Sequence, residues 1–275
     1  MLNPRDIRRR FDRAAASFDD ADFVHAVTRD GLLSRLEPLV IEGSRLLDLG
    51  SATGSSGRPL RKRFRRAHVV ALDLSHPMLL RARRKKSWLA KSSFVQADAR
   101  RLPFAPGSFD LVVANQLLPW VPDPQPLFAE VARVLRKGGV FAFATLGPDS
   151  LQELARAGLQ VNPFADMHDI GDGLVRAGLS DPVLDVDRLQ ISYNSVDQLF
   201  ADLTRIGARN TAIARPRGLT GRQVFGARAA SLSQGGNDGR ILLNLELVYG
   251  HCWGSGRGND PTVTIFDANS IPLRR

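Results

Sequence analysis

The chain has 275 residues, of which 43% are hydrophobic and 24% are charged, so it is neither disordered, collagen-like nor a coiled coil. No apolar run approaches the roughly 20 residues of a membrane helix, and the basic N-terminus lacks the apolar segment of a signal peptide. The single cysteine, Cys252, excludes an internal disulfide and favours a cytoplasmic location. The net charge of +10 favours a polyanionic partner, which composition leaves open between nucleic acid, an anionic membrane and an acidic protein.

Strands and helices are predicted to alternate through the first half of the chain. A basic helical segment comes first, over residues 1–40. Short apolar runs bounded by turn residues then predict five strands, over 45–50, 68–73, 93–98, 109–115 and 139–145. Helices are predicted over 77–89 and over 126–139, the second ending at Gly138 and Gly139. This alternation predicts a doubly wound, mostly parallel α/β sheet that binds its ligands at the carboxyl ends of the strands.

The second half of the chain does not continue this regular alternation of short strands and helices. Helices are predicted over 151–159, 169–179, 195–208 and 220–232, and strands over 181–193 and 242–253. We expect a single domain over residues 1–275, with the cofactor-binding core at 41–150, later strands and a helical cap at 151–255, and a tail at 256–275. The helices that interrupt the later strands are expected to gather at one edge of the sheet.

The glycine-containing turn LDLGSATGSSG, residues 47–57, directly follows the first strand. Glycine at such a turn lets the backbone approach a ligand closely. A dinucleotide site needs a first glycine where Ala52 stands, and Asp48 would lie unfavourably near the pyrophosphate. S-adenosylmethionine carries no phosphate but has an ammonium and a sulfonium group, so a carboxylate at the strand end attracts it.

Further polar residues end the next three predicted strands. Asp73 stands where a ribose diol needs a bidentate acceptor, Asp98 where an adenine amino group needs an acceptor, and Asn115 ends the fourth strand. Three acids and a glycine turn in this order are more specific than an isolated glycine motif. The pattern therefore predicts an S-adenosylmethionine site.

On these motifs the core resembles class I S-adenosylmethionine-dependent methyltransferases, with D-L-G-S-A-T-G where that family usually has D/E-x-G-x-G-x-G. The resemblance implies a Rossmann-like fold. It also implies a cofactor site formed by Asp48, Gly50, Ala52, Gly54, Asp73, Leu74, Met78, Asp98, Ala99 and Asn115.

Segments outside the core resemble one family, the malonyl-acyl-carrier-protein O-methyltransferases of biotin synthesis. They are RRRFDRAAASFD (8–19), LPFAPGSFDLVVANQLLPWVPDP (102–124), TLGPDSLQEL (145–154), FADMHDIGDGLVRAGLSDPV (164–183), DLTRIGARN (202–210), RGLTGR (217–222) and ELVYGHCW (246–253). The chain departs from the family at Phe18, where tyrosine is frequent, and at Ala155, which stands where an arginine is frequent and is followed by Arg156.

This resemblance implies transfer of a methyl group to the free carboxylate of malonyl-acyl-carrier protein, at the start of pimeloyl and biotin synthesis. A carboxylate is already an ionised nucleophile at neutral pH, so catalysis needs positioning and exclusion of water but neither a general base nor a metal. The candidates for positioning are Phe18, Trp120, Arg156 and Arg209. An arginine is expected to hold the malonyl carboxylate, chosen from Arg156, Arg205, Arg209 and Arg215.

Acyl-carrier protein is very acidic, and the basic runs 58–66 and 81–86 are candidate docking surfaces for it. A nucleic-acid partner is not expected. Enzymes that methylate amino groups of bases usually carry N/D-P-P-Y/F where this chain has NQLLPW, and cytosine-C5 methylation needs a cysteine there. The alternatives that stay open are an RNA or small-acid methyltransferase, and a cofactor-binding relative without activity such as a respiratory-complex assembly factor. No membrane partner is expected.

Overall fold

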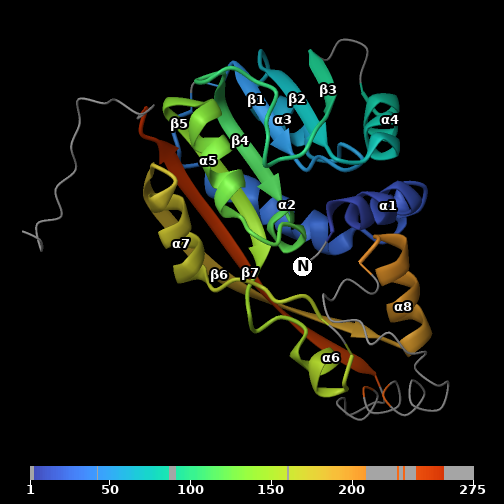
Figure 1. Ribbon diagram of the computed structural model, residues 1–275. Helices are drawn as coiled ribbons and strands as arrows, with labels where there is room; N and C mark the ends of the chain where they lie inside the picture. The colour runs from blue at the N-terminus through green and yellow to red at the C-terminus, as the bar shows by residue number, and fades with distance from the viewer. Residues whose placement is uncertain are drawn as a thin grey trace, which may run out of the picture.

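The computed structural model describes residues 3–41, 43–86, 91–159, 161–208, 228, 232 and 240–256. One mixed sheet runs through the described part of the chain in the order β3-β2-β1-β4-β5-β7-β6 (Figure 1). Its strands are β1 (Arg45–Leu49), β2 (His68–Asp73), β3 (Ser92–Gln96), β4 (Phe109–Asn115), β5 (Leu135–Leu146), β6 (Leu179–Tyr193) and β7 (Ile241–Gly254). The strands β1 to β5 are parallel to one another, and β7 is antiparallel to both of its neighbours, β5 and β6. The predicted mostly parallel, Rossmann-like sheet is confirmed.

Helices cover both faces of this sheet. They are α1 (Pro4–Ala14), η1 (Phe18–Asp20), α2 (Phe23–Leu36), α3 (Gly57–Arg63), α4 (His76–Arg84), η2 (Leu118–Trp120), α5 (Gln125–Val134), α6 (Gln152–Arg156), α7 (Met167–Arg176) and α8 (Val196–Arg205). Within the described ranges, no helix has the length and apolar character needed to cross a membrane.

The near-continuous apolar strands are explained by burial on both faces of the sheet. Successive side chains of a strand point to opposite faces. Leu47 of β1 accordingly packs in a core with Phe128 of α5, whereas its neighbour Leu46 packs in a second core with Leu36 of α2 and Leu60 of α3. Each parallel strand between these cores must therefore be apolar on both sides, which is the pattern that the sequence shows.

Several predicted boundaries were wrong, and two of them bear on the strands that carry the site. The helix predicted over 126–139 ends at Val134, because Leu135 is extended and pairs with Phe109 of β4, so that β5 already begins there. The third strand ends at Gln96, and Asp98 therefore lies in the following loop. The sheet pairing overrides the helical spacing of the apolar residues. The helix predicted over 220–232 lies outside the described residues except for positions 228 and 232.

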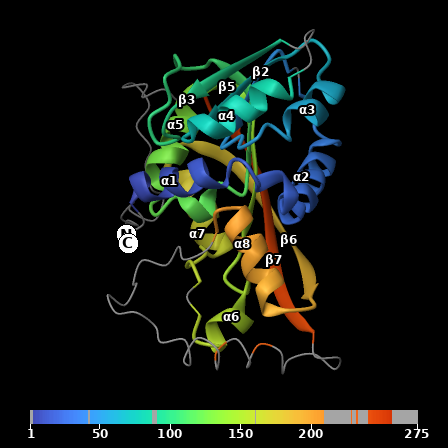
Figure 2. The same cartoon turned by 90° about the vertical axis from the view of Figure 1, so that its right-hand side faces the viewer.

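The N-terminal segment crosses the carboxyl ends of the parallel strands. In Figure 2, α1 runs directly below α4, and the two helices pack together. Farther along the sheet, α6 packs on β7, while α8 contacts both β6 and η1. The N-terminal segment therefore lies between the strand ends and α8. The division into core, cap and tail stays a prediction.

Candidate active site

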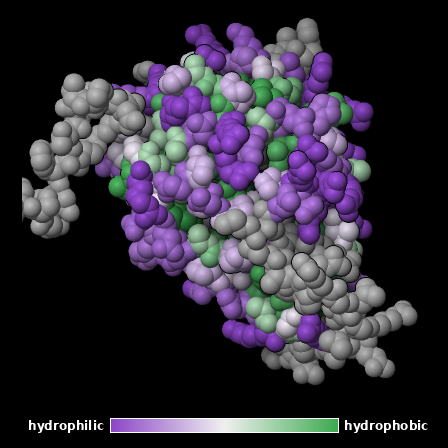
Figure 3. Space-filling model, viewed as in Figure 1, coloured by the Kyte–Doolittle hydropathy of each residue, from purple (hydrophilic) through white to green (hydrophobic). Residues whose placement is uncertain are grey.

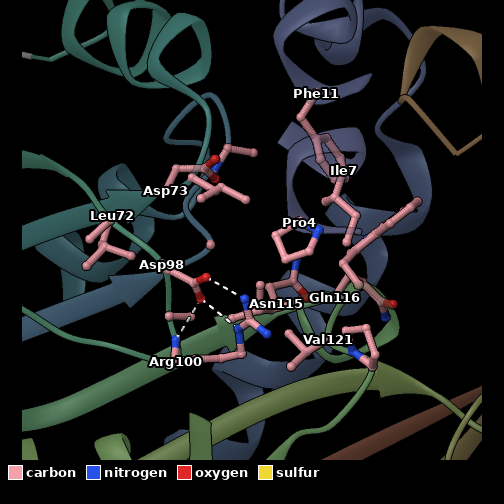
Figure 4. Close-up of a pocket in the computed structure, with 18 of the residues that line it drawn as sticks. Pro4, Ile7, Phe11, Leu72, Asp73, Asp98, Arg100, Asn115, Gln116 and Val121 are labelled. Atoms are coloured by element: carbon pink, nitrogen blue, oxygen red, sulfur yellow. Dashed lines mark hydrogen bonds and ion pairs between the residues drawn. The ribbon is translucent and has the colours of Figure 1, made fainter. Parts of the chain in front are cut away.

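A cleft opens at the carboxyl ends of β1, β2 and β4 and is closed on its other side by α1 (Figure 4). Its empty volume, with the open mouth included, is about 820 Å³. Leu72, Asp73 and Asp98 lie on one side of the cleft, and Pro4, Ile7 and Phe11 of α1 lie opposite them. The site expected from strand topology is therefore enclosed between the sheet and the N-terminal helix.

The glycine turn after β1 forms one wall of the cleft. Gly50 has φ +75°, and the backbone N–H groups of Gly50 and Ser51 both donate to the Leu72 carbonyl, at 2.8 and 2.9 Å. Ala52 adopts φ +45°, an unfavourable region for a residue with a Cβ. Gly54 does not line the cleft. A glycine is needed there for packing, because a Cβ would lie 2.8 Å from the Cβ of Ala82 on α4.

Asp73, at the end of β2, is fixed by backbone groups on both sides. Its Oδ2 accepts from the Ala52 N–H at 2.8 Å, and its Oδ1 accepts from the Ser75 N–H at 2.8 Å. Burial raises the pKa of Asp73 to about 6, and these hydrogen bonds act in the opposite direction. The carboxylate therefore links the glycine turn to the start of α4, with one face toward the cleft.

Asp48 lies behind the glycine turn and is only 2% exposed. Its Oδ2 has no hydrogen-bond partner in the described part of the chain. Burial, followed by the negative charge of Asp73, raises the pKa of Asp48 to about 7, although Arg29 acts to lower it. A buried acid without a partner is costly, and a cation brought into the cleft offsets that cost.

Asp98 occupies the far side of this acidic end and pairs with Arg100. The Arg100 Nη2 lies 2.7 Å from Asp98 Oδ2, and the Arg100 backbone N–H donates to Oδ1 at 2.9 Å. The hydrogen bonds from the Arg100 side chain are the main cause that lowers the pKa of Asp98. Asp98 is therefore a firmly ionised acceptor, and Ala99 beside it lines the same wall.

Amides occupy the opposite end of the cleft, after β4. Asn115 donates through Nδ2 to the His25 carbonyl at 2.9 Å, whereas its Oδ1 has no partner among the described residues. Gln116 follows with φ +56°, and its backbone N–H donates to the Ala144 carbonyl at 2.7 Å. The two ends of the cleft thus differ in charge, with carboxylates at one and neutral amides at the other.

Aromatic side chains of the N-terminal segment close the cleft. Phe11 of α1 meets Trp120 of η2 edge to face with ring centroids 4.8 Å apart, and Phe18 meets His25 at 5.0 Å. Phe18 is 3% exposed and packs with Met78 of α4. Burial lowers the pKa of His25 to about 4, so its imidazole is neutral at pH 7. The lining of the cleft is therefore largely apolar.

Polar contacts hold this segment in place. Asp19 forms an ion pair with Lys85, N to O 2.6 Å, and also accepts from the Thr53 hydroxyl of the glycine turn. Ser75, which caps α4, donates to Asp12 of α1 at 2.7 Å. Asp19 thus connects the N-terminal segment to α4 and to the glycine turn, and Asp12 connects it to the start of α4.

The structure brings most of the predicted site residues together. Those that line the cleft are Phe18, Gly50, Ala52, Asp73, Leu74, Asp98, Ala99, Asn115 and Trp120. Asp48, Gly54 and Met78 lie behind its walls. Arg156 is not among the lining residues and is exposed on α6, which Figure 1 places away from the carboxyl ends of β1, β2 and β4. Arg209 lies outside the described residues.

Several lining residues were missed by the sequence analysis. They are Pro4, Ile7, His25, Leu72, Ala97, Arg100, Gln116, Leu117, Val121 and Pro122. The helical spacing of Ile7 and Phe11 gave a partial signal, since an apolar face must pack on something. The sequence around Arg100 and Gln116 gave no such signal, because the positions of these side chains depend on turns that the local sequence does not specify.

Comparison with known proteins shows which family this chain resembles. Residues 47–143 match the family model described as a methyltransferase domain. A malonyl-[acyl-carrier protein] O-methyltransferase of Laribacter hongkongensis is 41% identical, with 90% of this chain and 88% of the relative covered. A protein of the same name from Halorhodospira halophila is 38% identical, with 100% and 97% covered.

The chain belongs to the malonyl-[acyl-carrier protein] O-methyltransferase family. Its fold is also that of the YcgJ protein of Bacillus subtilis, with a TM-score of 0.61 at 15% identity over 83% of this chain and 98% of that one. As a member of this methyltransferase family the protein is an enzyme, and its methyl donor is S-adenosylmethionine.

The residues present fit this methyl donor. The buried Asp48, whose Oδ2 has no partner in the described structure, suits a ligand that carries an ammonium and a sulfonium group. Asp73 and Asp98 supply acceptors in the order that a ribose and an adenine amino group require. Among the described residues, no group of three or more His, Cys, Asp or Glu side chains could hold a metal ion.

Proposed function

We propose that the protein transfers the methyl group of S-adenosylmethionine to the free carboxylate of malonyl-[acyl-carrier protein], giving the methyl ester that enters pimeloyl and biotin synthesis. The observation that carries this proposal is the near full-length identity to proteins of that name, 38% over the whole chain in one case. The cleft supports the proposal, because its acidic end suits a cationic methyl donor and its end next to β4 is lined mainly by apolar side chains. Methylation of a carboxylate needs no general base there.

The residues act by binding and orientation. In the proposed site Asp73 and Asp98 bind the adenosine half, and Asp48 attracts the cationic amino-acid half through the glycine turn. Bound S-adenosylmethionine supplies an activated methyl group on a sulfonium. The carboxylate is ionised at neutral pH, so no side chain has to remove a proton. The lowered pKa of His25, about 4, leaves it a weak base, which is consistent with a reaction that needs none.

Enclosure supplies the rest of the proposed catalysis. Phe11, Phe18 and Trp120 surround the end of the cleft next to β4 and keep water away from the reacting groups. Water solvates a carboxylate and a sulfonium strongly and thereby raises the barrier to their reaction. A dry site that holds the two groups in line lowers that barrier through positioning and exclusion of solvent.

The proposal is tested by a single-turnover assay with a radiolabelled methyl donor. Purified protein is mixed with malonyl-acyl-carrier protein, malonyl-CoA, acetyl-acyl-carrier protein or bulk RNA, and the label is followed into each. We expect label on the malonyl substrates, in a form that alkali releases as a methyl ester is released, and none on the acetyl carrier. Label on RNA alone, or on a different acid in preference to malonyl, contradicts the proposal.

We further propose that the carrier docks on the exposed arginines of α1 and α4. Arg83 and Arg84 of α4 are exposed, and α4 packs against α1, whose exposed side chains include Arg9 and Arg13. Figure 3 shows hydrophilic side chains over the region where Figure 1 draws these helices. Because α1 also lines the cleft, a carrier bound here lies next to the site. An acidic carrier would be steered to this surface by its charge.

The basic run of α3 provides a matched control for this surface. Arg83→Glu with Arg84→Glu changes the charge by the same amount as Lys62→Glu with Arg66→Glu, and all of these side chains are exposed. Lys85 is left intact because it holds Asp19. We expect the α4 pair to raise KM for the carrier about 3–10-fold in low salt and less at high salt, as screening predicts. An equal effect from the α3 pair contradicts this choice of surface.

A further inference from the structure

Gln116 is a polar residue of the cleft that the cofactor site does not use. It is 5% exposed and lines the cleft, yet its side-chain Nε2 has no hydrogen-bond partner within the described structure. A buried amide nitrogen without a partner is costly. The donor is therefore available to a group that enters the cleft.

The backbone at Gln116 turns this side chain toward the site. Successive residues of a strand alternate between faces, so Asn115 and its neighbour would normally point apart. The φ of +56° at Gln116, held by its N–H bond to the Ala144 carbonyl, breaks that alternation, and both residues line the same cleft. A left-handed conformation is unfavourable for glutamine and persists because the surroundings impose it.

The order of the strands fixes which part of the reaction this residue faces. β3 and β2 precede β1 in the sheet, and β4 lies on its other side. A ligand with its adenosine half at Asp73 and Asp98 therefore points its reactive end toward β4. In Figure 4 Gln116 and Asn115 lie together, across the cleft from Asp73.

Among the described residues, this end of the cleft has no unpaired cation that could hold the substrate carboxylate. Among the described lining residues the only Arg or Lys is Arg100, and it is paired with Asp98. His25 is neutral at pH 7, with its pKa lowered to about 4 by burial. Methyl transfer neutralises the carboxylate and the sulfonium together, so a cation on the reacting carboxylate would stabilise the starting state more than the transition state. A neutral donor orients the carboxylate with little of that penalty.

We propose that the side-chain amide of Gln116 donates a hydrogen bond to one oxygen of the substrate carboxylate and so directs the other oxygen at the methyl group. The carboxylate oxygen forms a bond to the methyl carbon, the bond from carbon to sulfur breaks, and its electron pair remains on sulfur. No proton moves. This inference rests on the proposed function, and it replaces the arginine that the sequence analysis expected as the holder of this carboxylate.

Two substitutions of similar size test the inference. Gln116→Leu removes the donor, and Gln116→Glu replaces it with a negative acceptor. Both variants keep the hydrogen bond from the backbone N–H to the Ala144 carbonyl. Both also have a side chain beyond Cβ, so the left-handed backbone conformation is about equally unfavourable in each. S-adenosylhomocysteine binding, measured by calorimetry, is expected to stay within about twofold of the unaltered protein for both variants. The kcat/KM for malonyl-acyl-carrier protein is expected to fall at least about 30-fold with leucine and further with glutamate.

A binding experiment separates the carboxylate from the rest of the substrate. With S-adenosylhomocysteine present, the unaltered protein is expected to bind malonyl-acyl-carrier protein at least about tenfold more tightly than the acetyl form. Gln116→Leu should remove that preference by weakening binding of the malonyl form only. A merely structural role would weaken both forms equally.

Three results overturn the inference. Unchanged kcat/KM in the leucine variant shows that the donor is not used. Loss of S-adenosylhomocysteine binding, or of folding as judged by the thermal midpoint, in both variants shows that Gln116 supports the cofactor end or the fold. A malonyl preference that survives in the glutamate variant excludes contact with the carboxylate. If the unaltered protein methylates no malonyl substrate, the proposed function itself fails, which is a different result from any of these.

Discussion

The two ends of the cleft are built from opposite chemistry, although both lie at the carboxyl ends of neighbouring parallel strands. At the end formed by β1, β2 and the loop after β3, Asp48, Asp73 and Asp98 are buried or partly buried carboxylates. The pKa values of Asp48 and Asp73 are raised to about 7 and about 6. At the end near β4, Asn115 and Gln116 are neutral amides with one unpartnered polar atom each in the described structure.

The difference matches a reaction between ions of opposite charge. In the proposed site, carboxylates at the first end bind a cationic methyl donor and suit the hydroxyl groups of its ribose. Carboxylates at the second end would repel the anionic substrate, while free cations would hold it too firmly in its starting state. The neutral N–H donor of Gln116 can orient an anion without either effect. The site thus separates attraction for one reactant from orientation of the other.

The strongest test of the acidic end is Asp73→Ala. We expect S-adenosylhomocysteine to bind about 100-fold more weakly, because one or two hydrogen bonds to a charged group are lost at roughly 1.5–3 kcal/mol each. Calorimetry measures the change. Asp172→Ala, on the exposed face of α7, is the matched control and should bind normally. Equal affinities in the two variants would remove Asp73 from the binding site.

A smaller effect on binding is expected from Asp48→Asn. The carboxylate attracts a cation without lining the cleft, so its loss should weaken S-adenosylhomocysteine binding about 3–10-fold at pH 7.5. The unaltered protein should lose affinity between pH 7.5 and pH 5.5, because Asp48, whose pKa is about 7, becomes protonated there. In the asparagine variant this pH dependence should be shallower, and an unchanged slope would show that Asp48 is not the titrating group.

The same substitution should stabilise the ligand-free protein. The pKa of Asp48 is raised from 3.8 when the chain folds, so the folded state holds its proton more tightly than the unfolded state does. The penalty for ionising it is absent below about pH 4, grows as pH rises and is complete above about pH 7. The thermal midpoint of Asp48→Asn should exceed that of the unaltered protein by roughly 2–6 °C at pH 8, and by less at pH 5. A lower midpoint at pH 8 would contradict the burial argument.

The smallest expected effect concerns the strained turn beside Asp73. Ala52→Gly removes a Cβ from a backbone with φ +45°, which should raise the thermal midpoint by about 1–3 °C while S-adenosylhomocysteine affinity changes less than about threefold. Ala157→Gly makes the same chemical change at φ −73° and should lower the midpoint instead. If both variants lose stability, Ala52 contributes contacts that outweigh its backbone cost.

The sequence predicted the acidic end of the cleft better than the amide end, for a local reason. Asp48 and Asp73 come at the ends of apolar strands and flank a glycine turn, so their place at one edge of the sheet follows from strand direction alone. The amide end depends on the left-handed turn at Gln116, which is imposed by pairing with Ala144 on β5. The residues next to Gln116 in the sequence do not indicate that contact.

The candidate arginines illustrate the same limit. A cation was expected for the substrate because carboxylates usually pair with arginine, and Arg156 was one choice. Arg156 is exposed on α6, and Arg100, the arginine that lines the cleft within the described ranges, is paired with an acid. Arg209 and Arg215 lie outside those ranges. Which charged side chain faces a site depends on how helices from distant parts of the chain pack, and composition carries no information about that.

By itself, the sequence determined that strands and helices alternate in the first half of the chain, that the parallel strands are apolar on both faces, and that acids stand near the ends of β1 and β2. Strand periodicity and strand-end polarity are local properties. The tertiary structure alone decided that β5 begins at Leu135 and that Gln116 lines the cleft. Each of these depends on contacts between residues far apart in the chain, where packing and hydrogen bonding outweigh the local preference.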